Sequence, residues 1–592
     1  MNSEPQSLKY DINMITRIFV QLMPAAILSM IIPSINSVID VFVASRYIGT
    51  SAVTAIGYFT PFTYVLAGIS AILAGGSVIL MGKYLGGGKH KEACELFSTD
   101  MIIVEIIIVL ISVMTELFAF QMADILGANG DMIKGTGDYL RGIAFSFPAT
   151  YGTVHLTSFL ELEQRHKRNI IGVFTMLALN ISLDVMFVAV FNMGLWGLGL
   201  ATSVAAWGNF LIQVQYYMTK DAQLRFSLKD MRPGLIWEIV KIGFPGAVTQ
   251  IYLAIRGYMM NSMLQDCSGE VGVAALATQA TLGAFTYAAS YGISVATRTL
   301  FSVFVGSKDV YSLKMVMKTA FFRVIPFSFL FAIFMTSLSV PFTRIFYSDP
   351  TTEVYHLTLL LFLTNPFAMF LSGFGQIFST YYQCHSWMKI TNVISAFDGI
   401  IGMAVSMLVL TPILGALGVW LSYITNGFIV IIVILIFTII KTKKFPVSID
   451  DWMILPEGFG IPAEHRREFS VHNLSDVTKC SETIMEFCDE EGVDKKHSYF
   501  AGLAMEEIAR NVVTKGFENG KKHTCAIEIA ASKDELIVRI IDDGRAFDPV
   551  QRAKLIDPDD PIKNIGVRLV RGISKDMNYS RVVGLNVLTI SI

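Results

Sequence analysis

Acidic side chains interrupt two long apolar stretches in the first third of the chain. Asp40 lies one helical turn after Asn36 in the stretch from Met14 to Ala44, and Asp184 lies one turn after Asn180 in a later stretch. Residues four apart share a helical face, so each acid is expected beside an amide. A carboxylate there is costly unless it faces a protein interior or a watery cavity. The two acids could bind a small hard cation or share a proton.

The last quarter of the chain carries a second group of residues. Glu507 and Asn511 are one turn apart, which lets the amide bind Mg²⁺ while the carboxylate activates a water or hydroxyl. Asp542 follows a predicted strand and could accept a hydrogen bond from an adenine amino group, and Gly544 lets the base approach. Gly566 lies at a predicted helix start, where backbone N–H groups can meet phosphate. This order favours a nucleotide site.

The composition indicates which elements must position these residues. Of 592 residues, 53% are hydrophobic and only 16% are charged, whereas soluble domains are nearer a quarter charged. The chain is therefore expected to be a polytopic membrane protein with a soluble part attached. A net charge of -2 gives no indication of nucleic-acid binding. The six cysteines show no metal-ligand spacing and are expected to be free thiols.

Twelve apolar segments can be drawn before Lys441. Their approximate spans are 14–44, 53–81, 95–119, 133–160, 169–191, 195–218, 236–263, 275–304, 313–340, 353–382, 389–411 and 414–440. Lys and Arg collect in alternate connections, such as 83–91, 165–168 and 220–232. The positive-inside rule predicts that these connections and both termini are cytoplasmic, in a multi-pass protein of the plasma (inner) membrane.

The apolar part also repeats itself at an offset of roughly 220 residues, with Pro24 matching Pro245. Two parallel six-helix repeats are a common transporter plan with the substrate site between the halves. The predicted domains are an N-terminal lobe (1–226), a C-terminal lobe (227–441), a linker (442–464) and a soluble domain (465–592).

The second half does not copy the acidic pair. Asn261 stands at the repeat equivalent of Asp40, and Asp398 is a weaker candidate near the equivalent of the fifth segment. Cation coupling is therefore predicted in the N-terminal half. Arg256 and Arg298 are expected to be mostly interfacial, with their charged ends reaching towards water.

Residues 14–440 resemble the multidrug and toxic compound extrusion (MATE) family of secondary transporters. The resemblance rests on VIDVFVASRYIGTSAVTAIG, on the G-K-x-x-G-G-G-K turn and on N-x-x-x-D in the fifth segment. It implies export of organic, often cationic or amphipathic compounds, driven by inward Na⁺ or H⁺. It also implies that Asp40, Asn180, Asp184 and Thr202 form the cation site.

Residues from about 465 to 592 are predicted to form a compact α/β domain. Residues 524–530 and 535–541 alternate like paired strands with a turn at 531–534, residues 499–513 have helical period, and 586–592 end the chain as a strand.

The motifs of this domain resemble the GHKL ATP-binding fold, and more closely the small serine-kinase anti-sigma factors. The resemblance implies ATP with Mg²⁺ as cofactors and an anti-sigma-antagonist-like protein partner. The roles carried over are Glu507 as base, Asn511 as Mg²⁺ ligand, Asp542 as adenine contact, and Gly544 and Gly566 as nucleotide-loop residues. Two positions depart from the pattern: Asn564 replaces a glycine, and Lys515 stands where His is frequent.

Three functions fit these observations. The first is a secondary exporter of small organic compounds, embedded among membrane lipids, with a nucleotide-binding regulatory tail. The second is a membrane-tethered serine kinase or anti-sigma-like switch whose transporter half senses a ligand. The third is a flippase for lipid-linked glycans. Whether the tail has kinase or ATPase activity stays open. ATP is not expected to power transport, because the sequence has no G-x-x-x-x-G-K phosphate loop.

Overall fold

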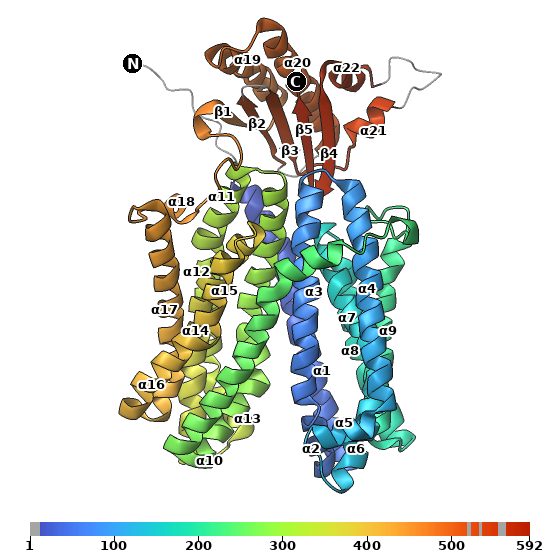
Figure 1. The fold of residues 1–592 in the computed structure, drawn as a ribbon, viewed down its shortest axis with the longest axis vertical. Coiled ribbons are helices and arrows are strands. Elements are labelled where there is room, and N and C mark those ends of the chain that lie inside the picture. Colours follow the sequence, from blue (N-terminus) through green and yellow to red (C-terminus); the bar gives the residue numbers. More distant parts are fainter. Residues whose placement is uncertain (1–11, 518–522, 532–534, 555–563) are drawn as a thin grey trace.

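The computed structural model describes residues 12–592, apart from 518–522, 532–534 and 555–563. A long bundle of helices carries a separate α/β domain at one end (Figure 1). We refer to that domain as the tail, to the bundle end beneath it as the tail side, and to the opposite end as the far side.

The first lobe of the bundle contains both predicted coupling acids. Its helices are α1 (Ile12–Val43), α2 (Thr50–Gly57), α3 (Thr60–Gly86), α4 (His90–Leu117), α5 (Ala119–Ile125), α6 (Asp131–Ala144), α7 (Phe147–Leu162), α8 (His166–Asp184) and α9 (Gly194–Tyr217). Two π-helical segments, η1 (Ala44–Ile48) and η2 (Val185–Val190), directly follow α1 and α8. Such π-segments inside helices often occur at functional sites.

The second lobe is built on one very long helix, α10 (Leu235–Gly306). The other elements are η3 (Leu228–Asp230), α11 (Val310–Thr319), η4 (Ala320–Val324), α12 (Ile325–Ser337), α13 (Ser339–Phe346), α14 (Glu353–Cys384), α15 (Met388–Ala396), η5 (Phe397–Ile401), α16 (Gly402–Leu414) and α17 (Ala416–Thr442). The helix α10 is interrupted only at Gly269, whose φ of 59° is a left-handed value that glycine adopts readily. The two segments predicted at 236–263 and 275–304 are its two halves.

Within the described ranges, ten helical stretches are long and apolar enough to cross a membrane. They correspond to ten of the twelve predicted segments. The other two are also helical: 133–160 is divided between α6 and α7, and 236–263 is the first half of α10.

The lobes pack closely on the tail side, where α3 runs along α10. A Cβ at Gly76 would lie 2.0 Å from the Ile239 carbonyl oxygen, and one at Gly86 would lie 1.9 Å from the Val303 carbonyl oxygen. Only glycine permits such close backbone approach. The tail side is therefore the end at which the lobes are held together.

The tail is an antiparallel sheet of five strands in the order β1-β2-β3-β5-β4. The strands are β1 (Arg466–Val471), β2 (Cys525–Ala531), β3 (Leu536–Asp542), β4 (Asp576–Val582) and β5 (Leu585–Ser591). The helices are α19 (Leu474–Glu490), α20 (Lys495–Asn511), α21 (Pro549–Lys554) and α22 (Ile565–Ile573), with η7 (Val512–Gly516) after α20. Between bundle and sheet lie α18 (Ile449–Trp452) and η6 (Ala463–His465). The predicted strands and helix are confirmed, while residues 532–534 of the predicted turn lie outside the described residues.

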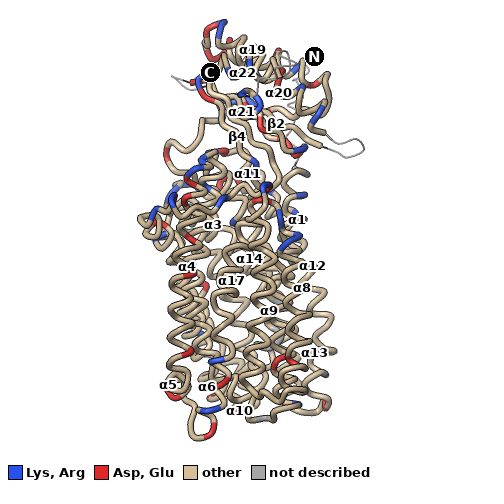
Figure 2. The backbone as a smooth tube through the Cα atoms, turned by 90° about the vertical axis from the view of Figure 1, so that its right-hand side faces the viewer, with Lys and Arg blue, Asp and Glu red and all other residues tan. Residues whose placement is uncertain are grey.

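The sheet is buried on both faces. Ile527 and Ile540 pack with the helices above the sheet, whereas Ala526, Ile541 and Val587 join the apolar cluster of the bundle. Alternate residues of a strand point to opposite faces, so one face of the tail is seated on the lobes. Lys and Arg collect at this end of the bundle (Figure 2).

Candidate functional site

Four predicted residues meet inside the first lobe. Asp40 is 7% exposed and Asp184 is fully buried. With its amide oriented to donate, the Asn180 nitrogen lies 2.9 Å from Asp40 Oδ1 and 3.0 Å from Asp184 Oδ2. The Thr202 hydroxyl donates to Asp40 Oδ2 over 3.3 Å. These side chains come from α1, α8 and α9, and they form what we call the acid pocket.

The acid pocket keeps unused acceptor capacity. Asp184 Oδ1 is buried and has no hydrogen-bond partner. The two carboxyl groups lie against the same Asn180 nitrogen. Asn36, which is also buried, places its Oδ1 2.9 Å from the Asn180 nitrogen. An enclosed set of carboxylate, amide and hydroxyl oxygens is suited to Na⁺ or to a shared proton.

A separate cavity of about 880 Å³ lies between the lobes. Residues of both lobes line it, but neither Asp40 nor Asp184 does. The expectation that Arg256 and Arg298 are interfacial is wrong, because both line this cavity. Sequence alone could not distinguish an arginine that reaches towards the membrane surface from one that faces a cavity between two lobes.

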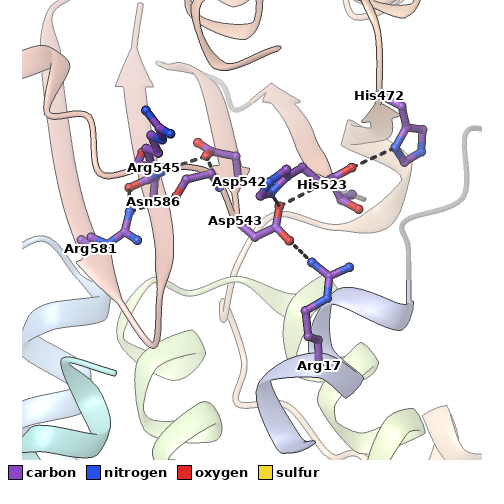
Figure 3. Close-up of polar contacts among 10 residues, drawn as sticks. Arg17, His472, His523, Asp542, Asp543, Arg545, Arg581 and Asn586 are labelled. Atoms are coloured by element: carbon purple, nitrogen blue, oxygen red, sulfur yellow. Dashed lines mark hydrogen bonds and ion pairs between the residues drawn. The ribbon is translucent and has the colours of Figure 1, made fainter. Parts of the chain in front are cut away.

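In the tail, Asp542 lies at the end of β3 and is 4% exposed. Its Oδ1 accepts from the Gly544 backbone N–H over 2.9 Å and from the Asn586 amide over 2.8 Å. Burial raises the pKa of Asp542 to about 6. Asn586 of β5 stands opposite Asp542 in the sheet register, and Figure 3 shows its side chain turned towards that carboxylate. Sequence reasoning missed this partner, because it depends on strand pairing.

The two other tail motifs meet at Glu507. A Cβ at Gly566 would lie 2.0 Å from Glu507 Oε2, so the start of α22 approaches this carboxylate as only a glycine allows. The Asn511 amide donates to the Glu507 carbonyl oxygen over 2.8 Å. Asn564 has φ of 62°, a left-handed value that asparagine tolerates better than most residues, so it can stand where the family pattern has glycine.

The segment after Asn511 connects these two parts. A Cβ at Gly544 would lie 2.8 Å from the Gly516 carbonyl oxygen, and that oxygen accepts from the Arg545 backbone N–H over 2.9 Å. The turn after β3 is thus held against the end of η7. All five predicted tail residues therefore belong to one neighbourhood, built from α20, η7, α22 and the turn after β3.

The residue next to Asp542 links the tail to the bundle. Asp543 forms an ion pair with Arg17 of α1 and accepts from His523 over 3.1 Å and from the Thr524 backbone N–H over 3.0 Å. Figure 3 shows Arg17 reaching from its helix towards Asp543. Sequence reasoning missed this pair, since its members are more than 500 residues apart.

Two helical lobes around a shared cavity, with a buried acidic pair in one lobe, define a polytopic membrane transporter. The MatE family model matches residues 25–186 and 245–408. The chain belongs to the MatE family. A model described as a histidine kinase-like ATPase domain matches residues 472–592 and so covers the tail apart from β1.

Two bacterial relatives have names that refer to multidrug export or resistance. The multidrug export protein MepA of Staphylococcus haemolyticus is 23% identical over 66% of this chain and 87% of its own length. The probable multidrug resistance protein YoeA of Bacillus subtilis is 22% identical over 67% of this chain and 88% of its own. Among solved structures, one similar fold is that of a mutant of the Vibrio cholerae MATE transporter VcmN. It aligns with a TM-score of 0.67 and 16% sequence identity, over 73% of this chain and 98% of its own length. That likeness supports the fold.

Proposed function

We propose that this protein is a secondary exporter that moves drug-like organic compounds out of the cell in exchange for inward Na⁺ or H⁺. The observation that carries the proposal is the acid pocket, in which Asp40 and Asp184 are buried together beside Asn180 and Thr202. The names of MepA and YoeA agree with a drug-like cargo. The basic residues at the tail side support a cytoplasmic tail.

The acid pocket supports coupling because it lies apart from the cavity between the lobes. An ion that binds there and a cargo that binds between the lobes do not compete for the same atoms. Each can then favour a different arrangement of the lobes, and exchange follows from their opposed preferences.

Transport by the full chain in proteoliposomes tests this proposal. An imposed Na⁺ or proton gradient is expected to drive dye export, and Asp40→Asn or Asp184→Asn is expected to lower the gradient-driven rate at least about tenfold. Asp124→Asn changes an exposed acid on α5 and serves as the matched control. Export that ignores both gradients and survives the double Asp40→Asn, Asp184→Asn change would exclude coupling at this pocket.

We further propose that the tail binds ATP with Mg²⁺ and regulates the transporter. The buried Asp542 carboxylate and the close approach of Gly566 to Glu507 fit the adenine and phosphate ends of a nucleotide. Asn511 would hold the metal ion, which would neutralise phosphate charge.

The tail's contacts with both lobes support the regulatory role. The Val583 backbone N–H donates to the Leu162 carbonyl oxygen of the first lobe over 2.8 Å. Arg539 donates to the Ser307 carbonyl oxygen of the second lobe over 2.9 Å. Lobes that rock about a central site must separate at one end. A tail bonded to both lobes at one end opposes separation there.

The Arg17–Asp543 ion pair gives this regulation a direct test. Arg17→Gln and Asp543→Asn are each expected to reduce the effect of ATP on the transport rate, and the double variant is expected to be no worse than either single one. Arg510→Gln, which removes an exposed pair with Glu506 on α20, is the control. Transport that is equally insensitive to ATP in wild type and variants would remove the regulatory proposal and leave the exporter proposal untouched.

A further inference from the structure

The charged groups of the cavity between the lobes have no role in the proposed coupling. Among the described residues, four side chains of formal charge line it: Glu161, Arg256, Arg298 and Asp398. Glu161 belongs to α7 of the first lobe, and the other three belong to the second lobe. This set of charges limits the kind of cargo that the cavity can accept.

Neither guanidinium is directly paired. In the part of the chain that the structure describes, no carboxylate oxygen lies within 4 Å of Arg256 or Arg298. Arg256 instead lies over the Tyr423 ring, 5.6 Å from its centroid, and Arg298 Nε is buried without a hydrogen-bond partner. An enclosed charge without a partner is unfavourable. The wall of the cavity thus has guanidinium donors that remain available.

The two arginines lie at different levels of α10. Arg256 is 13 residues before the kink at Gly269 and Arg298 is 29 residues after it, so at about 1.5 Å per residue one carboxylate does not reach both. Asp398 attracts Arg256, and Glu161 attracts Arg298, in each case from beyond direct contact. The acids therefore balance the formal charge of the cavity but leave the arginine hydrogen-bond donors free.

Arginine is the side chain best fitted to bind a carboxylate, since its planar fork offers parallel N–H donors. A cargo that is only cationic would leave the Arg298 donors without an acceptor. A cargo with a carboxylate would satisfy them, and the aliphatic and aromatic lining, such as Val78, Leu253 and Tyr291, would contact its apolar body.

We propose that the preferred cargo of this transporter is an amphipathic organic carboxylate, whose carboxylate binds Arg298 in the cavity between the lobes. The geometry favours Arg298 because its Nε is buried without a hydrogen-bond partner, whereas the Arg256 guanidinium lies over the Tyr423 ring. The inference rests on the exporter function and narrows it. It assigns Arg298, which lies outside the acid pocket, to cargo selection and gives it no part in ion coupling.

A pair of fluorescent probes tests the proposal. The first is a xanthene dye with a free carboxylate, and the second is its methyl ester, which keeps the ring system and loses the negative charge. Binding to the full chain in detergent is measured by fluorescence anisotropy. The acid is expected to bind at least about tenfold more tightly than the ester, as for hydrogen bonds to a charged group.

Substitutions identify the residue responsible for the tighter binding of the acid. Arg298→Gln is expected to weaken binding of the acid about tenfold and to leave binding of the ester unchanged or improved. Arg344→Gln alters an exposed arginine of α13 outside the cavity lining and is the matched control. If that variant fails to fold, the comparison of acid and ester on the wild-type chain still tests the preference for a carboxylate.

The outcomes separate the two proposals. Equal binding of acid and ester, or losses that are the same for both dyes in Arg298→Gln, would overturn the carboxylate inference. Gradient-driven export of the ester would still support the exporter. If neither dye is exported under any gradient but the acid binds selectively through Arg298, the exporter proposal fails and the binding site stands.

Discussion

The adenine contact predicted at Asp542 depends on the protonation of one buried carboxyl group. Both bonds to Asn586 and Gly544 are made to Oδ1, which leaves Oδ2 to accept from an amino group. Acceptance requires the ionised form, and burial raises the pKa of Asp542 to about 6. The site is therefore expected to lose affinity within the mildly acidic range.

ATP affinity of the full chain, measured by calorimetry, is accordingly expected to be constant above about pH 7 and to fall towards about pH 5. The affinity falls with falling pH because protonation of the Asp542 carboxylate removes the hydrogen-bond acceptor. Asp542→Asn is expected to bind weakly and to lose this part of the pH dependence. A wild-type profile that matches that of Asp542→Asn would show that another group, such as the ATP phosphate, titrates instead.

The contact between Gly566 and Glu507 gives a second expectation. A methyl group at Gly566 would collide with Glu507 Oε2, so Gly566→Ala should displace the start of α22 and weaken ATP binding about tenfold or more. Gly572→Ala, on the same helix with open space around it, should leave affinity unchanged. Equal affinities for the two variants would contradict the assigned phosphate end.

At the residue scale, sequence reasoning succeeded where a residue type is unusual for its surroundings. Acids such as Asp40 and Asp184 inside apolar stretches give a strong signal, and the structure brings them together. Sequence reasoning missed Asn586 and Arg17, because strand register determines the partner of Asn586 and the packing of the tail on the bundle determines the partner of Arg17. No local pattern encodes either.

At the scale of single elements, the packing of α3 against α10 is limited by glycines. A Cβ at Gly243 would lie 1.8 Å from the Ile72 carbonyl oxygen, so the helices meet through their backbones. Gly243→Ala is expected to destabilise the protein by about 1–3 kcal/mol, which is typical of overpacking. Thermal unfolding in detergent measures this, with Gly257→Ala, at an open position of the same helix, as control. Equal midpoints for both variants would mean that the interface can shift freely.

The elements themselves were largely predictable. Apolar stretches identify membrane helices, and period-two alternation identified β2 and β3 as a pair. Alternation could not reveal the burial of Glu528 and Arg539. These residues form a cross-strand pair on the face of the sheet that lies against the bundle. A polar face of a strand normally indicates solvent, and here it indicates a second domain.

At the scale of the whole molecule, the packing of the tail on the bundle predicts slow amide hydrogen exchange where the two meet. The Val583 amide donates to Leu162 of the first lobe, so its hydrogen exchange should be slow while the tail is seated. If nucleotide unseats the tail, ATP with Mg²⁺ should speed exchange in the β4–β5 turn by about tenfold or more. The paired strands β2 and β3 should remain protected as an internal control. Unchanged exchange in the β4–β5 turn would place regulation elsewhere.

The linker between Thr442 and the first strand of the tail joins the bundle and the tail in one polypeptide. A tethered domain faces its docking surface at an effective concentration that short flexible linkers place in the millimolar range. Individually weak contacts, such as the Arg17–Asp543 pair, would then be sufficient for the proposed regulation, and the response would not depend on how much protein the cell makes. Under the proposed regulation, every transporter would carry its own regulator in a fixed one-to-one stoichiometry.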